Sequence, residues 1–263
     1  MIINLRKLTV QNENTTSLNK FISQTGFCSR READKLLEQC RVTVNGNIAK
    51  PGNRIMDNDE VLIDGLPLKR KVKTIYIAFN KPVGISSTTD LKDKYNIISY
   101  INHSLRIFPI GRLDKPSEGL IFLTNDGDIV NKILRAGNNH EKEYVVTVDK
   151  PITSDFIKKM GSGVNILDTV TQKCYVKQEE KFKFRIILTQ GLNRQIRRMC
   201  DVLNCKVTRL VRIRIMNITL AGIPVGKWRY LTTAEIAGIN KQVANSIKTE
   251  EASVLQSNNQ NYD

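Results

Sequence analysis

Two residues that could do chemistry together, Arg112 and Asp114, stand in a short polar stretch between two apolar segments. The apolar segments predict strands, and Pro116 and Gly119 shape the exit of the connection between them. A carboxylate held in such a connection can act as a nucleophile or a base when a nearby cation keeps it ionised. If the connection is extended, both side chains project to one side. An ion-paired surface aspartate is the alternative, and the residue types alone leave both open.

A second group of charged residues lies between 194 and 214, where seven Lys and Arg residues accompany one acid. The whole chain of 263 residues carries a formal net charge of +15. Such a surface favours a polyanionic partner, because neutralising phosphates releases counterions. We therefore expect Arg194 and Arg198 to contact a nucleic-acid backbone, with an ordinary solvated face as the alternative.

The sequence offers no visible cradle for a cofactor or a metal ion. It contains no glycine-rich nucleotide loop, its five cysteines form no Cys-x-x-Cys pair, and it has only two histidines. We predict that the chain works without a cofactor or a metal. It also lacks an apolar run of about 18 residues, the length that spans a bilayer, and its start lacks a secretory core. We therefore expect no membrane contact and a cytoplasmic location.

The first part of the chain predicts a small module of two helices followed by strands. Apolar residues at helical spacing predict a first helix that ends near Gly26, and a capping box at Ser29 begins the second helix. Residues 42–49 have the alternation and the Asn-Gly turn of a hairpin. We assign 17–66 to this αα-β domain and 1–16 to a disordered N-terminus.

The rest of the chain alternates strands with short helices. Several strands join through short turns, which favours an α+β fold with a mixed, mainly antiparallel sheet and flanking helices over a doubly wound fold. We assign 67–74 to a basic linker, 75–240 to this larger domain and 241–263 to a disordered C-terminal tail. The predicted strands cover 75–80, 107–110, 119–124, 144–148, 182–188, 207–218 and 228–231, and the predicted helices begin near Asp128, Thr153, Arg194 and Thr232.

Three segments in the larger domain resemble the motifs of the RsuA branch of pseudouridine synthases. The central motif is Gly111-Arg112-Leu113-Asp114, followed by SEGLIFLTNDG. The first motif is Asn80-Lys81-Pro82-Val83-Gly84, and the last is GLNRQIRRM, residues 191–199. Upstream, LNKFISQTGFCSRREADKLLEQCRVTVNG resembles the S4 RNA-binding domain. The resemblance runs from about 17 to 235.

This resemblance implies that the chain isomerises a specific uridine of RNA to pseudouridine, with Asp114 as the catalytic nucleophile or base. The details of 110–134, 138–153 and 189–217 are similar to those of a synthase that acts on 23S ribosomal RNA, so we expect that substrate. The resemblance also implies roles for other residues: Arg197 pairs with Asp114, Tyr144 stacks on the uracil, Arg112 occupies space near the displaced uridine, and Leu210 lies beneath the base.

The S4-like segment implies an RNA-binding face made of Lys20, Arg30, Arg31 and Lys35. Residues 17–66 contain seven basic and seven acidic side chains, so a local patch rather than net charge must provide the binding. We expect a monomer.

Two other functions remain open at this stage. One is a non-catalytic S4-type RNA-binding or ribosome-assembly protein, which an intact motif around Asp114 argues against. The other is an enzyme acting on a non-RNA glycoside, which would need a second carboxylate; the nearest is Glu118. The sequence leaves open which uridine is modified and whether transfer RNA is an additional substrate.

Overall fold

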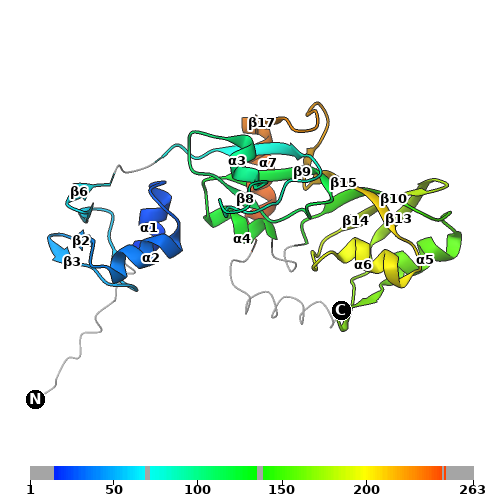
Figure 1. Cartoon of the computed structure of the whole chain (residues 1–263), viewed down its shortest axis with the longest axis horizontal. Coiled ribbons are helices and arrows are strands. Elements are labelled where there is room, and N and C mark those ends of the chain that lie inside the picture. Colours follow the sequence, from blue (N-terminus) through cyan, green and yellow to red (C-terminus); the bar gives the residue numbers. More distant parts are fainter. Residues whose placement is uncertain (1–14, 69–71, 135–138, 245, 247–263) are drawn as a thin grey trace, which may run out of the picture. The chain divides into compact units, whose positions relative to one another are not determined.

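The computed structural model describes residues 15–68, 72–134, 139–244 and 246, and the chain divides into two compact units, Met1–Lys73 and Thr74–Asp263 (Figure 1). Most of the predicted disordered termini and the centre of the predicted linker, 69–71, lie outside the described residues. At the predicted boundaries, Thr16 already belongs to a strand, and the last helix runs to Val243, past the predicted end of the larger domain at 240.

The N-terminal unit packs two helices against short strands. Ser29 and Glu32 form the predicted capping box at the start of the second helix, with each side chain bonded to the other residue's backbone N–H. In the predicted hairpin, Asn45 and Gly46 have φ of 50° and 79°, as a two-residue turn of type I′ requires. The sheet order is β3-β2-β5-β6, and β1 pairs with β4. The elements are β1 (Thr16–Ser17), α1 (Leu18–Gln24), α2 (Arg30–Glu38), β2 (Val42–Val44), β3 (Asn47–Ile48), β4 (Arg54–Ile55), β5 (Val61–Ile63) and β6 (Leu66–Pro67).

The second unit is built on one large mixed sheet of order β13-β14-β10-β15-β9-β7-β17, with β8 beside β9 and β16 beside β15. Every pairing in it is antiparallel except β15 with β9, so the predicted mixed, mainly antiparallel sheet is confirmed. Its strands are β7 (Tyr76–Lys81), β8 (Phe108–Ile110), β9 (Glu118–Thr124), β10 (Lys142–Val148), β13 (Tyr175–Glu180), β14 (Lys183–Leu188), β15 (Val207–Ile215), β16 (Ile218–Thr219) and β17 (Trp228–Tyr230). A separate small hairpin pairs β11 (Asn165–Ile166) with β12 (Thr169–Val170).

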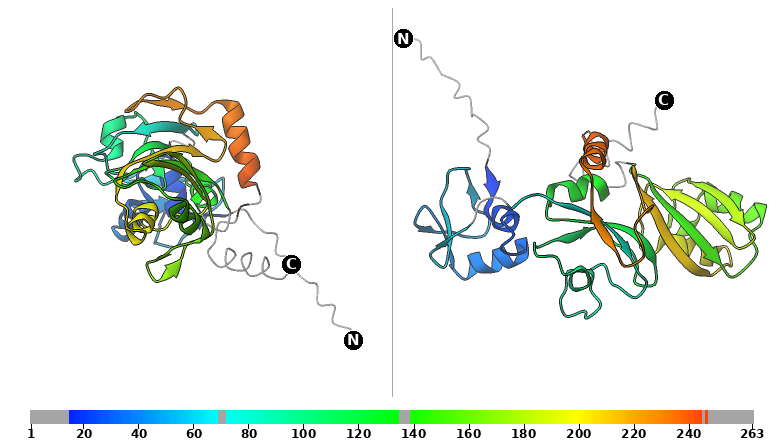
Figure 2. Two further views of the ribbon diagram at one scale, coloured as in Figure 1. Left: turned by 90° about the vertical axis from the view of Figure 1, so that its right-hand side faces the viewer. Right: turned by 90° about the horizontal axis from the view of Figure 1, so that it is seen from above.

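Helices cover this sheet so that β9 is buried on both faces. Leu120 and Phe122 pack in a core with α4 (Asp128–Leu134) and α7 (Thr233–Val243), whereas Ile121 and Leu123 pack in a second core with α3 (Ile97–Ile101). A third core joins β10 and β14 to α5 (Ser154–Ser162) and α6 (Gln195–Val202). The strand β15 runs between the two halves of the sheet (Figure 2). No helix among the described residues is long and apolar enough to cross a membrane.

The single strand predicted over 207–218 is wrong, because the chain turns back at Met216 and Asn217. Met216 has a φ of 52°, and Ile215 then pairs with Ile218. The turn contains no glycine or proline, so the sequence carries no turn signal there. The prediction therefore continued the strand through it. The edge strand β13 was also missed, since its YVKQEE sequence is mostly exposed and half of its residues are charged.

Candidate active site

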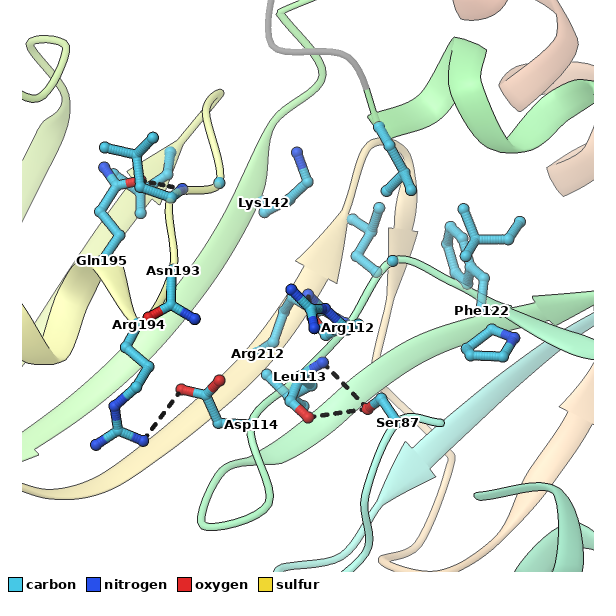
Figure 3. A pocket seen from close by; sticks show the side chains of 18 of the residues that line it. Ser87, Arg112, Leu113, Asp114, Phe122, Lys142, Asn193, Arg194, Gln195 and Arg212 are labelled. Carbon is cyan, nitrogen blue, oxygen red and sulfur yellow. Dashed lines mark hydrogen bonds and ion pairs between the residues drawn. The ribbon is translucent and has the colours of Figure 1, made fainter. Parts of the chain in front are cut away.

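The connection from Gly111 to Ser117 joins β8 to β9 and opens on a cavity of about 830 Å³. Within this connection Ser117 donates a backbone hydrogen bond to the carbonyl of Asp114, 2.9 Å long. The cavity is also lined by residues of β10, β15 and the segment that leads into α6 (Figure 3). Residues of β8, β9, β10 and β15 therefore line the same cavity as Asp114.

Two arginines flank the carboxylate of Asp114. Its Oδ2 lies 3.8 Å from Arg194 Nη1 and 3.9 Å from Arg197 Nε. These are ion-pair distances rather than hydrogen bonds. The structure thus places Arg197 where the sequence predicts it, and it adds Arg194, which the sequence predicts only as a phosphate contact. The Arg194 backbone is left-handed, with φ 50° and ψ 34°, directly before α6.

The guanidinium of Arg197 is anchored from the side away from Asp114. Nη2 donates to Pro116 O and Ser117 Oγ at 3.1 and 3.0 Å, and Nη1 donates to Val207 O at 3.3 Å. Its Nε is buried without a hydrogen-bond partner. Burial, and then Arg194, lower the pKa of Arg197, while Asp114 acts in the opposite direction. One donor of a fixed guanidinium is therefore left for the carboxylate or for a bound group.

The segment that begins with the first motif holds the Asp114 connection in place. Ser87 Oγ donates to Leu113 O at 2.8 Å and accepts from Leu113 N at 3.1 Å (Figure 3). Gly84 N donates to Lys115 O at 2.8 Å. These bonds fix the peptide before Asp114 and the peptide that joins Lys115 to Pro116. Sequence reasoning missed Ser87, which only its place shortly after the motif could have indicated.

Lys81 of the first motif is fully buried and donates to the carbonyls of Pro82 and Ile85 at 2.9 and 2.8 Å. Burial, and then Arg212, lower the pKa of Lys81 to about 8, while Asp114 and Glu118 oppose the shift. These contacts hold the turn that leads to Ser87.

Tyr144, Leu210 and Arg112 also line the cavity. Tyr144 is half-buried on β10, Leu210 is 6% exposed on β15, and Arg112 is exposed. The structure therefore brings the five predicted catalytic and uridine-binding residues together. Lys142, two residues before Tyr144, lines the same cavity and was not predicted; burial, and then Arg212, lower its pKa to about 8.

The basic stretch from 194 to 214 does not form one phosphate-binding face. Arg212 is 4% exposed, and Arg214 is bound to the carboxylates of Glu141 and Glu143. Arg198 donates to the Asn193 carbonyl and side chain at 3.1 and 3.2 Å, so its phosphate contact remains a prediction. The sequence shows how many basic residues the stretch contains, but it does not show which of them are buried or ion-paired in the fold.

The predicted S4 residues lie on the helices of the first unit, where Arg30, Arg31 and Lys35 are exposed on α2 and Lys20 is half-buried on α1. Arg31 and Lys35 share one face of α2 by their spacing of four. Among the described residues no cluster of three His, Cys, Asp or Glu side chains could hold a metal ion.

Comparisons with known proteins agree with the motifs. The RNA pseudouridylate synthase family model matches residues 75–201, and the S4 domain model matches 16–61. The dual-specificity RNA pseudouridine synthase RluF of Salmonella typhi is 57% identical over 89% of this chain and 82% of its own length. The ribosomal large subunit pseudouridine synthase B of Bacillus subtilis is 31% identical over 83% of this chain and 93% of its own. A crystal structure of a pseudouridylate synthase matches 85% of this chain and 99% of its own, with 27% identity and a TM-score of 0.62.

Proposed function

Because this chain belongs to the RNA pseudouridine synthase family, in its RsuA branch, and isomerises uridine in RNA, we propose that its substrate is a specific uridine of 23S ribosomal RNA. The large-subunit relative from Bacillus subtilis supports this substrate. The dual-specificity relative supports a second one, for which we propose transfer RNA. We also propose that the protein acts in the cytoplasm, in keeping with such a substrate, and that it acts as a monomer.

We propose Asp114 as the catalytic carboxylate. The observation that supports this role is its position at the cavity between two guanidinium groups, 3.8 and 3.9 Å away. Asp114 attacks the ribose C1′ or removes a C2′ proton while the N1–C1′ bond breaks. The freed uracil turns and forms the C5–C1′ bond; as it does so, the Asp114–C1′ ester bond breaks in the first route, and Asp114 returns the proton to C2′ in the second. C5 then loses its proton to solvent, while N1 gains a proton. Atoms and electrons balance, so no redox cofactor is required.

The other site residues bind the uridine in this proposal. Removing a base from a helix costs a few kcal/mol of stacking, so the enzyme must offer substitute contacts. Tyr144 stacks on the uracil, Leu210 lies beneath it, and Arg112 fills the space that the base leaves. Arg197 orients the carboxylate of Asp114, with Arg194 beside it. Lys20, Arg30, Arg31 and Lys35, together with Arg194 and Arg198, contact the RNA backbone.

The substrate is tested by mapping pseudouridines in ribosomal and transfer RNA from cells that lack the protein and from the same cells after rescue. We expect one or more 23S sites to disappear and to return on rescue. A 23S map that is unchanged by the deletion, with a loss confined to transfer RNA, would overturn the ribosomal assignment and leave the family assignment untouched.

Replacing Tyr144 tests the stacking role. Stacking of a base on an aromatic ring contributes about 1–3 kcal/mol, so Tyr144→Ala should slow conversion of saturated RNA by about 5- to 160-fold. Tyr144→Phe retains the aromatic ring, so its conversion rate should fall much less. Single-turnover assays with excess enzyme measure both. Equal losses in the two variants would instead assign the role to the hydroxyl.

Replacing the α2 basic residues tests the S4 face. The triple variant Arg30→Ala, Arg31→Ala, Lys35→Ala should weaken RNA binding and reduce the slope of log K against log salt by about 2–3, near 0.9 per lost phosphate contact. Binding titrations at several salt concentrations measure the slope. Lys50→Ala, an exposed lysine of the same unit outside α2, is the control. An unchanged slope in the triple variant would remove this face from the proposal.

A further inference from the structure

A β-bulge in β15 aims neighbouring arginines at opposite faces of the sheet. Arg214 lies opposite Glu143 of β10, and Arg212 lies opposite Tyr144, with the register shifted between them at Ile213. Glu143 and Tyr144 are consecutive residues of a strand, so their side chains point to opposite faces. Bulges commonly re-aim side chains next to active sites. Here the bulge sends Arg212 toward the cavity and Arg214 toward the carboxylates behind it.

Arg212 contacts the elements that bear the proposed catalytic groups. Its Nε donates to Leu120 O of β9 at 2.6 Å, and its Nη1 donates to Arg112 O at 3.3 Å. Its Cζ lies 6.0 Å from the centre of the Tyr144 ring, within the range of a cation–π contact. The side chain is buried beside Arg112 and lines the cavity (Figure 3).

The backbone is shaped to allow this contact. Gly119, which pairs with Arg212 across the parallel β9–β15 ladder, has a φ of 113°. A Cβ atom at Gly119 would lie 2.3 Å from the Arg212 carbonyl oxygen. Only glycine therefore allows β9 to approach this closely, and the approach brings Arg212 within reach of the connection that bears Asp114.

We propose that Arg212 is a positioning residue, which ties the peptide of Arg112 to β9 and supports the Tyr144 ring, so that Asp114 and the ring keep a fixed separation. The inference rests on the proposed roles of Asp114 and Tyr144. A phosphate contact does not explain the site, because the guanidinium is enclosed and directed at two carbonyls. Purely local stability explains it poorly as well, because a buried cation whose Nη2 has no partner is a costly way to join two strands.

The test compares Arg212→Met and Arg212→Lys with Arg214→Met. Arg214 is the matched control, because it is an arginine on the same strand with strong ion pairs but it faces away from the cavity. Single-turnover conversion is measured with saturating enzyme on a 23S RNA fragment that contains the mapped uridine. RNA affinity and melting temperature are measured in parallel.

We expect Arg212→Met to slow conversion by about 100-fold, the scale of a misplacement near 1 Å, with little change in RNA affinity. Arg212→Lys keeps a cation that can donate to the carbonyls, so it should recover part of the rate. Arg214→Met should lower the melting temperature without this loss of rate. If Arg212→Met does not fold at the assay temperature, Arg212→Lys tests the inference instead: its conversion rate should fall while its RNA affinity stays the same, and an unchanged rate would contradict the positioning role.

Three outcomes would overturn the inference: unchanged conversion in Arg212→Met, lost RNA affinity at an unchanged saturated rate, or an equal loss of rate in Arg214→Met. A failure here is separable from a failure of the proposed function. Conversion that survives Asp114→Asn contradicts the catalytic assignment, whereas an inactive Asp114→Asn beside a fully active Arg212→Met contradicts only the positioning role.

Discussion

Asp114→Asn is expected to abolish pseudouridine formation while RNA binding and folding survive. The amide has nearly the size of the carboxylate but carries no charge and cannot act as the nucleophile or base, so the rate should fall on the order of 10⁴-fold or more. Folding should tolerate the change, because the Asp114 side chain makes only the ion pairs at 3.8 and 3.9 Å, and no hydrogen bond, with the residues that the structure describes. The two guanidinium groups remain to bind RNA.

The measurement is single-turnover conversion of a 23S RNA fragment, with affinity and melting temperature measured on the same preparations. Asp155→Asn is the matched control, since Asp155 is an exposed aspartate of α5 that forms an ion pair with Lys159. It should convert RNA at the wild-type rate. Mature 23S RNA with its full modification, in cells that carry only Asp114→Asn, would remove Asp114 from the catalytic role.

Much of the fold was predictable because its signals are local. The capping box needs only Ser29 and Glu32 at a spacing of three, and the hairpin turn needs only Asn45 and Gly46. The apolar run of β9 is equally local, and its burial on both faces explains why the run lacks alternation. The short helix α3 gave no such signal, because its five residues are too few to show a period.

The sequence predicts the site residues that lie in recognised motifs. It does not predict those whose place in the site depends on how distant segments fold together. Asp114 and Arg197 came from recognised segments, and the structure places them 3.9 Å apart. Ser87 came from neither motif nor pattern, and Arg212 was counted only as part of the basic stretch from 194 to 214. The role of Ser87 depends on a hydroxyl that bonds both the N–H and the carbonyl of Leu113, and the role of Arg212 depends on a bulge that turns its side chain inward. Both are contacts between distant segments.

The geometry explains why three separated motifs belong to one site. The first motif leads into the segment that holds Leu113, and the last contributes Arg197 to the carbonyl and hydroxyl that follow Asp114. The central motif contains the connection itself. Each flanking motif therefore binds the backbone of the Asp114 connection in addition to any contact with RNA, and its replacement should affect the rate more than the affinity.

Arg197→Met is the second change with a large expected effect. Compared with a change at Arg194, it distinguishes the roles of the two arginines beside Asp114. Removing a largely buried partner of a charge costs about 2–4 kcal/mol, which corresponds to a conversion rate about 30- to 1000-fold lower. The melting temperature should also fall, because the bonds to Pro116, Ser117 and Val207 are lost.

Arg194→Met should act differently from Arg197→Met. Arg194 is exposed, and its side chain forms an ion pair with Asp114 at 3.8 Å. Solvent weakens such pairs. Loss of the Arg194 guanidinium should mainly lower the RNA affinity and make that affinity less dependent on salt. The conversion rate at saturating enzyme should change little. Single-turnover rates at saturating enzyme, compared with binding titrations for both variants, distinguish the roles. If Arg194→Met lost more rate than Arg197→Met, the exposed arginine would be the partner of the carboxylate, and the anchoring of Arg197 would serve only to close the β8–β9 connection.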